Sequence, residues 1–344
     1  MNVCLASYQS VMLLKGGPRT QIFQTKEGLE KLGINVSLFD SWHDFVTDRT
    51  DIIHLFGANI GTYHLAREIH KQGIPFVVSP IFFSRHNPLF VRLFSAVGDN
   101  LRRLVRGSWT DYGIVAEICS WAHTVVPNTE REARLVHEGF NISEEKITII
   151  PNGVEDRFYH ATPDAFKNEY GIENFILNVG HIGPERKNVL RLIRALQKVN
   201  HPSVIIGRME DNNYAKICLK EAKNNTNLLM LDHLSHDSEL LASAYAACDV
   251  FVLPSQFETP GIAALEAGLA GAKIVITKHG GTENYFAQHA EYVEPTSAEL
   301  IHHGIITALN KPKSNDLREH IRKEFLWGKV AEKTLQVYRQ VLGS

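Results

Sequence analysis

Cysteine is scarce in this sequence of 344 residues, and the four cysteines (Cys4, Cys119, Cys218 and Cys248) are widely spaced. No two of them form a C-x-x-C pair, which disfavours a zinc cage, a dithiol redox motif and a disulfide-stapled scaffold. Buried, reduced thiols in a cytoplasmic protein are the interpretation that remains.

Long apolar runs and an excess of one charge are also missing. No uninterrupted apolar stretch approaches the ~18 residues that a transmembrane helix needs. Residues 1–7 contain no basic segment, so they predict a buried strand rather than a secretory signal. The formal net charge of −2 at pH 7 argues against a dedicated nucleic-acid-binding protein.

Histidine, in contrast, is abundant, with 17 residues in the chain. The densest group lies at 232–237 and includes His233 and His236. Its spacing matches no standard set of metal ligands. We therefore favour loop histidines over a metal site in this segment.

Short apolar segments alternate with amphipathic segments along the whole chain. This alternation predicts parallel sheets covered by helices on both faces, and the length predicts about two domains. The expected strands are 2–7, 34–39, 52–56, 75–79, 123–127, 147–150, 174–180, 203–206, 228–231, 249–253, 273–276 and 290–293; the expected helices include 18–32, 60–72, 129–139 and 326–342. The turn signal Pro151-Asn152-Gly153 indicates the boundary between the domains.

The segment 251–276 carries the most specific chemical signal and is expected to form a strand, a loop, a helix and a second strand. Pro260 suits the first turn of the helix, Glu258 lies in the loop before it, and Glu266 follows about two turns later. The backbone N–H groups of Gly261, Ile262 and Ala263 would then lie at the positive end of the helix, where an anion such as phosphate binds. The plainer alternative is an ordinary helix with one glutamate in its N-cap region and the other on its surface.

Glu258 and Glu266, separated by seven residues, resemble the E-x7-E signature of the retaining glycosyltransferases of family 4, which have the GT-B fold. Further segments resemble motifs of this family in the same order, at 15–19, 125–130, 149–154, 178–188, 246–255, 280–283 and 325–327. The resemblance implies an α/β protein with two Rossmann-like, doubly wound parallel-sheet domains facing a cleft. Residues 1–155 would bind the acceptor and 156–325 the nucleotide sugar, while the helix at 326–344 would pack back on the N-terminal domain.

The same resemblance implies transfer of a sugar from a nucleotide-diphosphate sugar, with no metal and no cofactor besides this co-substrate. Arg186 and Lys187 would stabilise the negative charge of the leaving diphosphate. Glu258 would bind sugar hydroxyls and support the anomeric centre, and Glu266 would bind the ribose hydroxyls. The other residues expected to bind the donor are Gly16, Gly17, Gly180, His181, Leu234, Thr259, Pro260, Gly261, Ile262 and Ala263.

The sequence departs from the family pattern at two positions. His181 replaces an arginine, so its charge depends on pH unless Arg186 supplies the cation. The histidine that the family often has after the strand at 75–79 is absent, and His86 is the candidate catalytic substitute, against the plain interpretation of a loop histidine. Arg85 and His54 are candidates for acceptor binding, although His54 is equally typical of a structural hydrogen-bonding residue.

Residues 88–109 have a helical apolar stripe flanked by arginines. Such a helix either contacts an anionic membrane surface or buries its apolar face in the domain core. The first alternative favours a lipid-linked acceptor, and the second favours a soluble saccharide.

The sequence thus predicts a cytoplasmic glycosyltransferase, peripheral at the membrane if 88–109 contacts lipid, that acts in the synthesis of a cell-surface polysaccharide or glycolipid. A UDP-sugar is the favoured donor, with GDP-mannose as an alternative. Two other classes stay open on the same fold: a non-catalytic sugar- or partner-binding subunit, and a sugar-nucleotide epimerase or phosphorylase.

Overall fold

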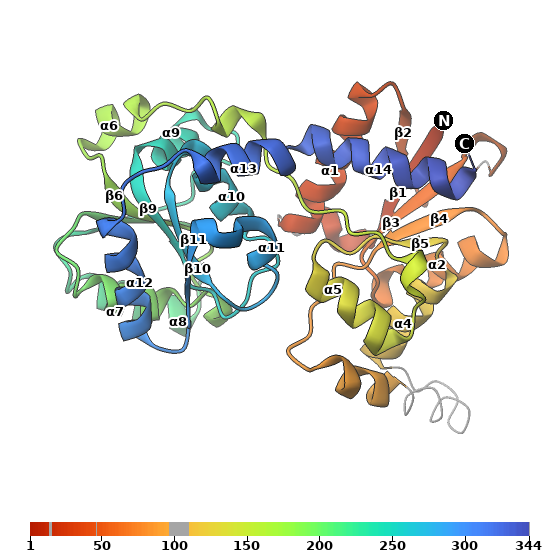
Figure 1. Cartoon of the computed structure of the whole chain (residues 1–344), viewed down its shortest axis with the longest axis horizontal. Coiled ribbons are helices and arrows are strands. Elements are labelled where there is room, and N and C mark those ends of the chain that lie inside the picture. Colours follow the sequence, from red (N-terminus) through yellow and green to blue (C-terminus); the bar gives the residue numbers. More distant parts are fainter. Residues whose placement is uncertain (14–15, 46, 96–109, 344) are drawn as a thin grey trace. The chain divides into compact units, whose positions relative to one another are not determined.

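The computed structural model describes residues 1–13, 16–45, 47–95 and 110–343. Lys15 and residues 96–109 of the expected basic helix lie outside these ranges. The chain divides into two compact units (Figure 1): unit 1 contains Met1–Gly153 and Trp327–Ser344, and unit 2 contains Val154–Leu326. Among the described residues, no helix combines the length and the apolar composition that crossing a membrane requires.

Unit 1 is built on a parallel sheet with the strand order β2-β1-β3-β4-β5. Its strands are β1 (Asn2–Ser7), β2 (Asn35–Leu38), β3 (Ile52–Phe56), β4 (Phe76–Ser79) and β5 (Thr124–Val125). Its helices are α1 (Gly17–Lys31), α2 (Ile60–Lys71), α4 (Asp111–Trp121), α5 (Glu130–Arg134) and α14 (Trp327–Leu342), with a π turn at Leu135–Gly139. Residues 88–95 are also helical.

The central strands of unit 1 are apolar on both faces, as expected for a parallel sheet covered by helices. In β3, Ile53 and Leu55 pack with residues of α2, α4 and the π turn at Leu135–Gly139. Ile52 and Phe56 point to the opposite face and pack with residues of α1 and α14. The apolar residues on both faces of β3 therefore reflect burial from two sides.

Helix α14 returns from the end of the chain to pack on α1 within unit 1. A Cβ added at Gly28 would lie only 2.7 Å from the Ala331 Cβ, which shows how closely the two helices approach. Trp327 is buried against Gly153, where an added Cβ would lie 2.5 Å from the indole ring. Glycine is thus required at both contacts.

Unit 2 is built on a parallel sheet with the order β11-β10-β9-β6-β7-β8. Counted from β6, this is the doubly wound order 3-2-1-4-5-6 of dinucleotide-binding folds. Its strands are β6 (Phe175–Val179), β7 (Ser203–Ile206), β8 (Leu228–Leu231), β9 (Cys248–Leu253), β10 (Lys273–Thr277) and β11 (Ala290–Val293). Its helices are α6 (Asp164–Tyr170), α7 (Val189–Leu196), α8 (Asn213–Ala222), α9 (Glu239–Ala247), α10 (Ile262–Ala270), α11 (Glu283–Phe286), α12 (Ala298–Asn310) and α13 (Asp316–Glu324).

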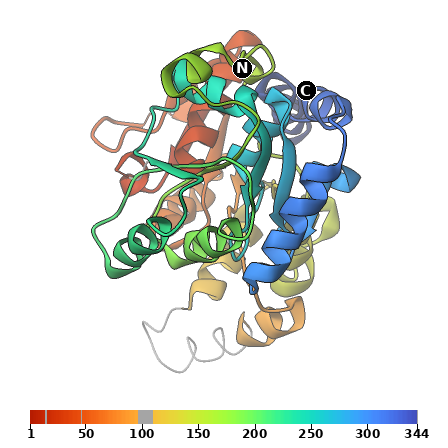
Figure 2. The same ribbon diagram turned by 90° about the vertical axis from the view of Figure 1, so that its left-hand side faces the viewer.

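Helices cover both faces of the unit 2 sheet (Figure 2). Phe251 and Leu253 of β9 pack with residues of α9, α10 and α13 on one face. Val250 and Val252 pack with residues of α7, α8 and α12 on the other. The α/β fold class, with two Rossmann-like parallel-sheet domains, is confirmed.

Two local expectations were wrong, and a third segment is helical as expected but differs in its hydrogen bonding. Residues 147–150 form an isolated bridge between Ile147 and Val125 instead of a strand. The neighbouring strand β5 has only two residues, and Pro127, which follows it, has no backbone N–H to donate to this segment. The expected helix 129–139 is α5 followed by a π turn. Pro260 precedes α10 instead of lying in its first turn, because Gly261 at φ 74° is left-handed and cannot be helical.

Candidate functional site

The strand order of unit 2 reverses between β6 and β9, which are neighbours in the sheet. In open α/β sheets, ligands bind at the carboxyl ends of the strands at such a reversal. The loop after β6 carries Arg186 and Lys187, and the loop after β9 carries Glu258. The topology thus brings together the charged residues that the sequence singled out.

Lys187 and Glu258 form an ion pair at this edge of the sheet. The Lys187 Nζ lies 2.6 Å from the Glu258 Oε1, and the Arg186 Nη1 lies 4.0 Å from the same oxygen. The side chains of Lys187 and Glu258 are 20% and 10% exposed, whereas Arg186 is 47% exposed. Partial burial strengthens the attraction between the charges, and Arg186 is the cation that remains accessible from solvent.

Backbone hydrogen bonds hold the two loops against each other. The Gln256 N–H donates to the Arg186 carbonyl at 2.7 Å. Asn188 is buried in a left-handed conformation, with φ of 60°, and its amide donates to the carbonyls of Pro254 and Pro295 at 2.9 and 2.7 Å. These bonds position Lys187 relative to Glu258 independently of their ion pair.

A third loop, after β10, fixes the backbone of Glu258. The Glu258 N–H donates to the His279 carbonyl at 3.0 Å, and the Gly281 N–H donates to the Glu258 carbonyl at 2.9 Å. Gly280 between them has a φ of 109°, and a Cβ there would lie 1.8 Å from the Glu258 carbonyl oxygen. The close approach of these two backbones therefore requires glycine at position 280.

The start of α10 follows directly after Glu258. Thr259, Pro260 and Gly261 lead into the helix, whose first residues are Ile262 and Ala263. The first N–H groups of an α-helix have no acceptor within the helix, so this end carries partial positive charge. The residues expected to bind an anion by their backbone are thus consecutive at one helix end.

Glu266 is the fifth residue of α10 and is buried. The Tyr245 hydroxyl donates to its Oε2 at 2.8 Å, and the His236 Nε2 lies 2.9 Å from its Oε1. The hydrogen bond to Glu266 raises the pKa of His236 to about 9. Leu234, in the same loop as His236, is partly buried against the core of unit 2.

Gly180 and His181 follow β6 at the same edge. The Gly180 N–H donates to the Ile206 carbonyl at 3.0 Å, and no atom lies within 4 Å of a Cβ added at Gly180. Burial lowers the pKa of His181, although Glu210 lies 4.0 Å away and opposes the shift. Neutral His181 leaves Arg186 and Lys187 as the cations of these loops near pH 7.

Gly16, Gly17 and His54 belong to unit 1. Gly16 precedes α1 and Gly17 begins it. His54 is buried: its Nδ1 lies 2.6 Å from the Tyr338 hydroxyl and its Nε2 lies 2.9 Å from the Ser79 hydroxyl. Burial lowers the pKa of His54 to about 3, so this arrangement is that of a neutral, structural histidine rather than an accessible acceptor ligand.

Arg85 and His86 lie in the exposed loop between β4 and the helix at 88–95. The His86 ring stacks on Phe90 with centroids 4.2 Å apart, and Phe90 stacks on Phe94 at 4.5 Å. The structure thus gives His86 an aromatic neighbour, and no carboxylate orients it within the described residues.

Sequence reasoning missed a buried carboxylate that supports this loop. The Glu132 carboxylate accepts the N–H groups of Phe82 and Asn128 at 2.7 and 2.8 Å. Burial raises the pKa of Glu132 to about 7. It also missed the contact between His236 and Glu266, although the histidine-rich segment 232–237 was visible in the sequence.

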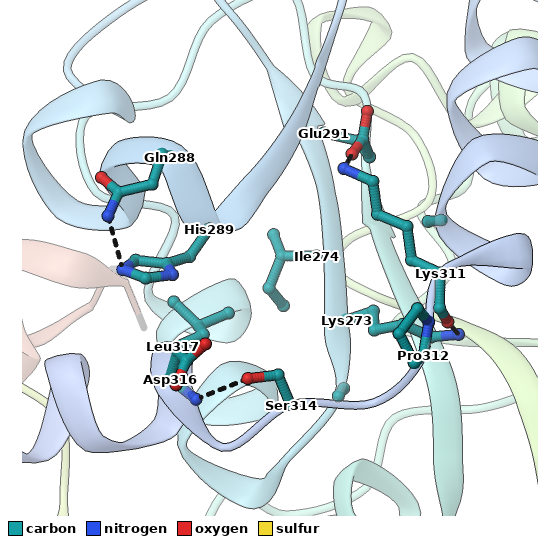
Figure 3. A pocket seen from close by; sticks show the side chains of 12 residues that line it. Lys273, Ile274, Gln288, His289, Glu291, Lys311, Pro312, Ser314, Asp316 and Leu317 are labelled. Carbon is teal, nitrogen blue, oxygen red and sulfur yellow. Dashed lines mark hydrogen bonds and ion pairs between the residues drawn. The ribbon is translucent and has the colours of Figure 1, made fainter.

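A separate pocket lies at the opposite edge of the unit 2 sheet (Figure 3). Lys273 and Ile274 begin β10, and Glu291 lies at the start of β11, so the pocket is at the amino ends of these strands. Three of its charged side chains already have partners, because Lys311 pairs with Glu291, and Lys273 pairs with Asp249. Within the described ranges, no group of three or more His, Cys, Asp or Glu residues is arranged to hold a metal.

Two family models match adjacent parts of the chain. The model described as Glycosyltransferase Family 4 matches residues 38–158, and the model described as Glycosyl transferases group 1 matches residues 163–324. Together these ranges cover most of the sequence.

Relatives and solved structures of similar proteins agree with the matches to these two family models. An uncharacterized glycosyltransferase of Methanocaldococcus jannaschii is 25% identical over 340 residues, which cover 92% of this chain and 80% of that protein. The processive diacylglycerol alpha-glucosyltransferase of Acholeplasma laidlawii is 23% identical over 309 residues, covering 85% and 83%. The structure of Anabaena HepE in complex with UDP and glucose has a TM-score of 0.69 at 16% identity, covering 99% of this chain and 100% of that one.

Proposed function

Since this chain belongs to glycosyltransferase family 4 and has the GT-B fold, we propose that it transfers a sugar from a nucleotide-diphosphate sugar to a saccharide or lipid-linked acceptor. We further propose that the anomeric configuration is retained and that no metal takes part. The observation that carries the proposal is the group of Arg186, Lys187 and Glu258 at the strand-order reversal of unit 2.

The charges of this group suit the departure of a diphosphate. Negative charge grows on the diphosphate as its bond to the sugar breaks, and fixed cations lower the energy of that state. Arg186 and Lys187 are proposed to supply them. Glu258, held beside Lys187, is proposed to accept hydrogen bonds from the sugar and to support the positive anomeric centre.

The remaining donor contacts are proposed from the family resemblance and from the place of each residue in its own unit. The N–H groups of residues 261–263 are proposed to bind phosphate oxygens. Gly16 and Gly17, at the start of α1, are proposed to let the backbone approach phosphate closely. Glu266 is proposed to accept the ribose hydroxyls, as an acidic residue does in dinucleotide-binding folds.

A UDP-sugar is the proposed donor, with GDP-mannose as the alternative. The similar HepE structure, a complex with UDP and glucose, supports this choice. The name of the Acholeplasma relative, a diacylglycerol glucosyltransferase, supports a lipid acceptor. On these grounds we propose a role in glycolipid or cell-surface polysaccharide synthesis.

The described part of the expected basic helix fits a lipid-linked acceptor. Leu89, Leu93 and Phe94 on the helix at 88–95 are 68%, 67% and 50% exposed, and Arg92 lies exposed beside them. Exposed apolar side chains next to arginine suit an anionic membrane surface. Arg85 and His86, in the loop before this helix, are the proposed acceptor contacts.

The donor test is a thermal-shift panel of UDP, GDP, ADP, CMP and UDP- and GDP-sugars, without added metal, on the wild type and on Glu266→Ala. A ligand at about 100 times its Kd stabilises the protein by about 2.7 kcal/mol. We expect one nucleotide to raise the melting temperature, and the rise to be smaller in Glu266→Ala. No shift with any nucleotide would contradict the proposal and favour a non-catalytic subunit.

Activity separates a transferase from the other enzymes on this fold. Incubation of the nucleotide sugar with crude lipid and oligosaccharide fractions should give a glycosylated product with the wild type and none with Glu258→Ala. An epimerised nucleotide sugar, or release of a sugar phosphate, would instead indicate an epimerase or a phosphorylase.

Membrane contact is tested by co-sedimentation with phosphatidylglycerol and phosphatidylcholine vesicles. We expect binding to the anionic vesicles and loss of binding in a Leu89→Ser, Leu93→Ser variant. Equal sedimentation of the wild type and this variant would favour a soluble acceptor.

A further inference from the structure

Glu266 has partners on both of its carboxylate oxygens, and the two partners differ in their exposure. Tyr245, on Oε2, is 1% exposed and lies in α9 beneath the carboxylate. The side chain of His236, on Oε1, is 42% exposed, whereas that of Glu266 is 6% exposed. Tyr245 therefore holds Glu266 from the interior, and His236 covers the oxygen on the side that faces solvent.

The charges around His236 favour its imidazolium form. Besides Glu266 on α10, the His236 Nδ1 lies 3.4 Å from Asp237 and 3.6 Å from Glu155. Arg157 opposes them, but its guanidinium stacks on Phe158 and donates to the backbone carbonyl of His236 at 2.6 Å. Together with the pKa of about 9, this makes the contact with Glu266 an ion pair at neutral pH.

These groups come from three separate segments of the chain. His236 lies between β8 and α9, Glu155 and Arg157 lie in the segment that opens unit 2, and Glu266 lies in α10. All of them belong to unit 2, so the contact is formed within one compact unit. A sequence motif around the two glutamates does not include the histidine, which is 30 residues away from Glu266.

We propose that His236 competes with the ribose hydroxyls for the Oε1 of Glu266 and so lowers the affinity of this chain for nucleotides. We call this contact between His236 and Glu266 the latch. The inference rests on the proposed role of Glu266. Ribose hydroxyls need an oxygen of Glu266 as acceptor, and Oε1 is the one on the solvent side. A nucleotide that binds there displaces the imidazolium, and the loss of this ion pair subtracts from the binding free energy.

Removal of the latch should therefore strengthen binding of nucleotides that carry a ribose diol. The test is isothermal titration of UDP, GDP and ADP into the wild type, His236→Ala and His236→Gln at pH 7. We expect His236→Ala to lower the Kd of the nucleotide that binds by about three- to tenfold, which corresponds to an ion pair of modest energy. His236→Gln, which keeps a hydrogen-bond donor without the charge, should give a smaller decrease.

Two further measurements separate the latch from a general effect on folding. The 2′,3′-dideoxy analogue of the same nucleotide should bind the wild type and His236→Ala with the same Kd, because it makes no use of Oε1. The wild-type Kd for the natural nucleotide should fall as the pH rises from 7 to 9.5 and His236 loses its proton, whereas the Kd of His236→Ala should stay level. His303→Ala, an exposed histidine on α12, is the matched control and should behave like the wild type.

The outcomes are distinguishable. Nucleotide binding that weakens or does not change in His236→Ala overturns the latch and leaves the proposed function standing, because His236 would then stay in place and support the ribose. Binding of none of the three nucleotides to any variant overturns the proposed donor site, and the latch with it.

Discussion

The Nζ of Lys187 lies 2.6 Å from the Oε1 of Glu258, although the two residues are 71 positions apart in the chain. Each is the most buried charge of its own loop, and each neutralises the other. The two groups proposed to act on opposite ends of the bond that breaks, the diphosphate and the sugar, are thus coupled through one hydrogen bond. Changing either of them alters the environment of the other.

This coupling predicts strongly non-additive effects on transfer. We expect Lys187→Met and Glu258→Gln each to lower kcat about 10²–10³-fold, because each removes charge aimed at the transition state. The double variant should lose much less than the product of the two, because the second change removes a group already misplaced by the first.

The measurement is a double-mutant cycle on initial rates with the nucleotide sugar that the thermal panel identifies. Lys198→Met, which removes an exposed pair with Glu299, is the matched control and should leave the rate unchanged. Fully multiplicative losses would show that Lys187 and Glu258 act independently.

Glycine at position 280 is predicted to be essential for the backbone of Glu258. Gly280→Ala should destabilise unit 2 by about 1–3 kcal/mol more than Gly271→Ala, because overpacking is added to the strain of a positive φ. Gly271 is a close control, since its φ of 102° is similar to the 109° of Gly280 and no atom lies within 4 Å of its added Cβ.

Calorimetry measures the difference in stability between the two variants. The thermal unfolding transition of unit 2 can be distinguished from that of unit 1 by tryptophan fluorescence. All four tryptophans (Trp42, Trp109, Trp121 and Trp327) belong to unit 1. The transition without a change in tryptophan fluorescence is therefore that of unit 2. Equal effects of the two substitutions would mean that the loop moves away from Glu258 at little cost.

His54 predicts a loss of stability of unit 1 in acid. Burial holds the pKa of His54 at about 3 in the folded state, below its usual value of 6.5, so the unfolded chain binds the extra proton first. The stability that His54 contributes is present above about pH 6.5 and is lost as the pH falls towards 3. In His54→Gln, this part of the pH dependence should disappear.

Denaturant unfolding followed by tryptophan fluorescence measures the effect at several pH values. The informative quantity is the difference in unfolding free energy between the wild type and His54→Gln. A difference that does not change between pH 6.5 and pH 4 would contradict the assignment of His54 as a buried neutral residue.

Glu132 predicts the opposite trend in the same unit. Burial raises its pKa to about 7 from the usual 4.5, so the folded state binds the extra proton between these values. Its contribution to stability therefore decreases as the pH rises from about 4.5 to 7. Glu132→Gln should remove this slope, and it should cost about 1–3 kcal/mol at low pH, because the amide leaves one backbone N–H without an acceptor.

The same fluorescence measurement checks Glu132, with Glu138→Gln on the exposed side of the helical segment as the control. Identical pH profiles of the wild type and Glu132→Gln would show that Glu132 stays ionised in the folded protein.

The strands were predictable from sequence where burial is two-sided. In β3 and β9, apolar residues at neighbouring positions occupy both faces of the strand, as is typical of a parallel sheet between helices. The segment at 147–150 has a similar pattern, but a strand also needs a neighbour with free donors, and β5 provides too few. An apolar pattern does not report the length of the partner strand.

The site was predictable in its residues but not in its contacts. The spacing of Glu258 and Glu266 identified both carboxylates. Nothing in the sequence predicts that Lys187 contacts Glu258, 71 positions away, or that His236 contacts Glu266, 30 positions away. The π turn after α5 was equally hidden, since hydrophobic periodicity does not distinguish bonds to the fourth residue from bonds to the fifth.

Helix α14 also determines the order in which the two units can complete their folds during synthesis. Unit 2 is continuous in sequence, so all of it is synthesised before α14. Unit 1 is interrupted, and one apolar face of its inner strands is covered by α1 but not by α14 until Trp327 and Tyr338 are synthesised. The domain that is translated first is therefore completed last, and part of one face of its N-terminal sheet stays uncovered while unit 2 is synthesised.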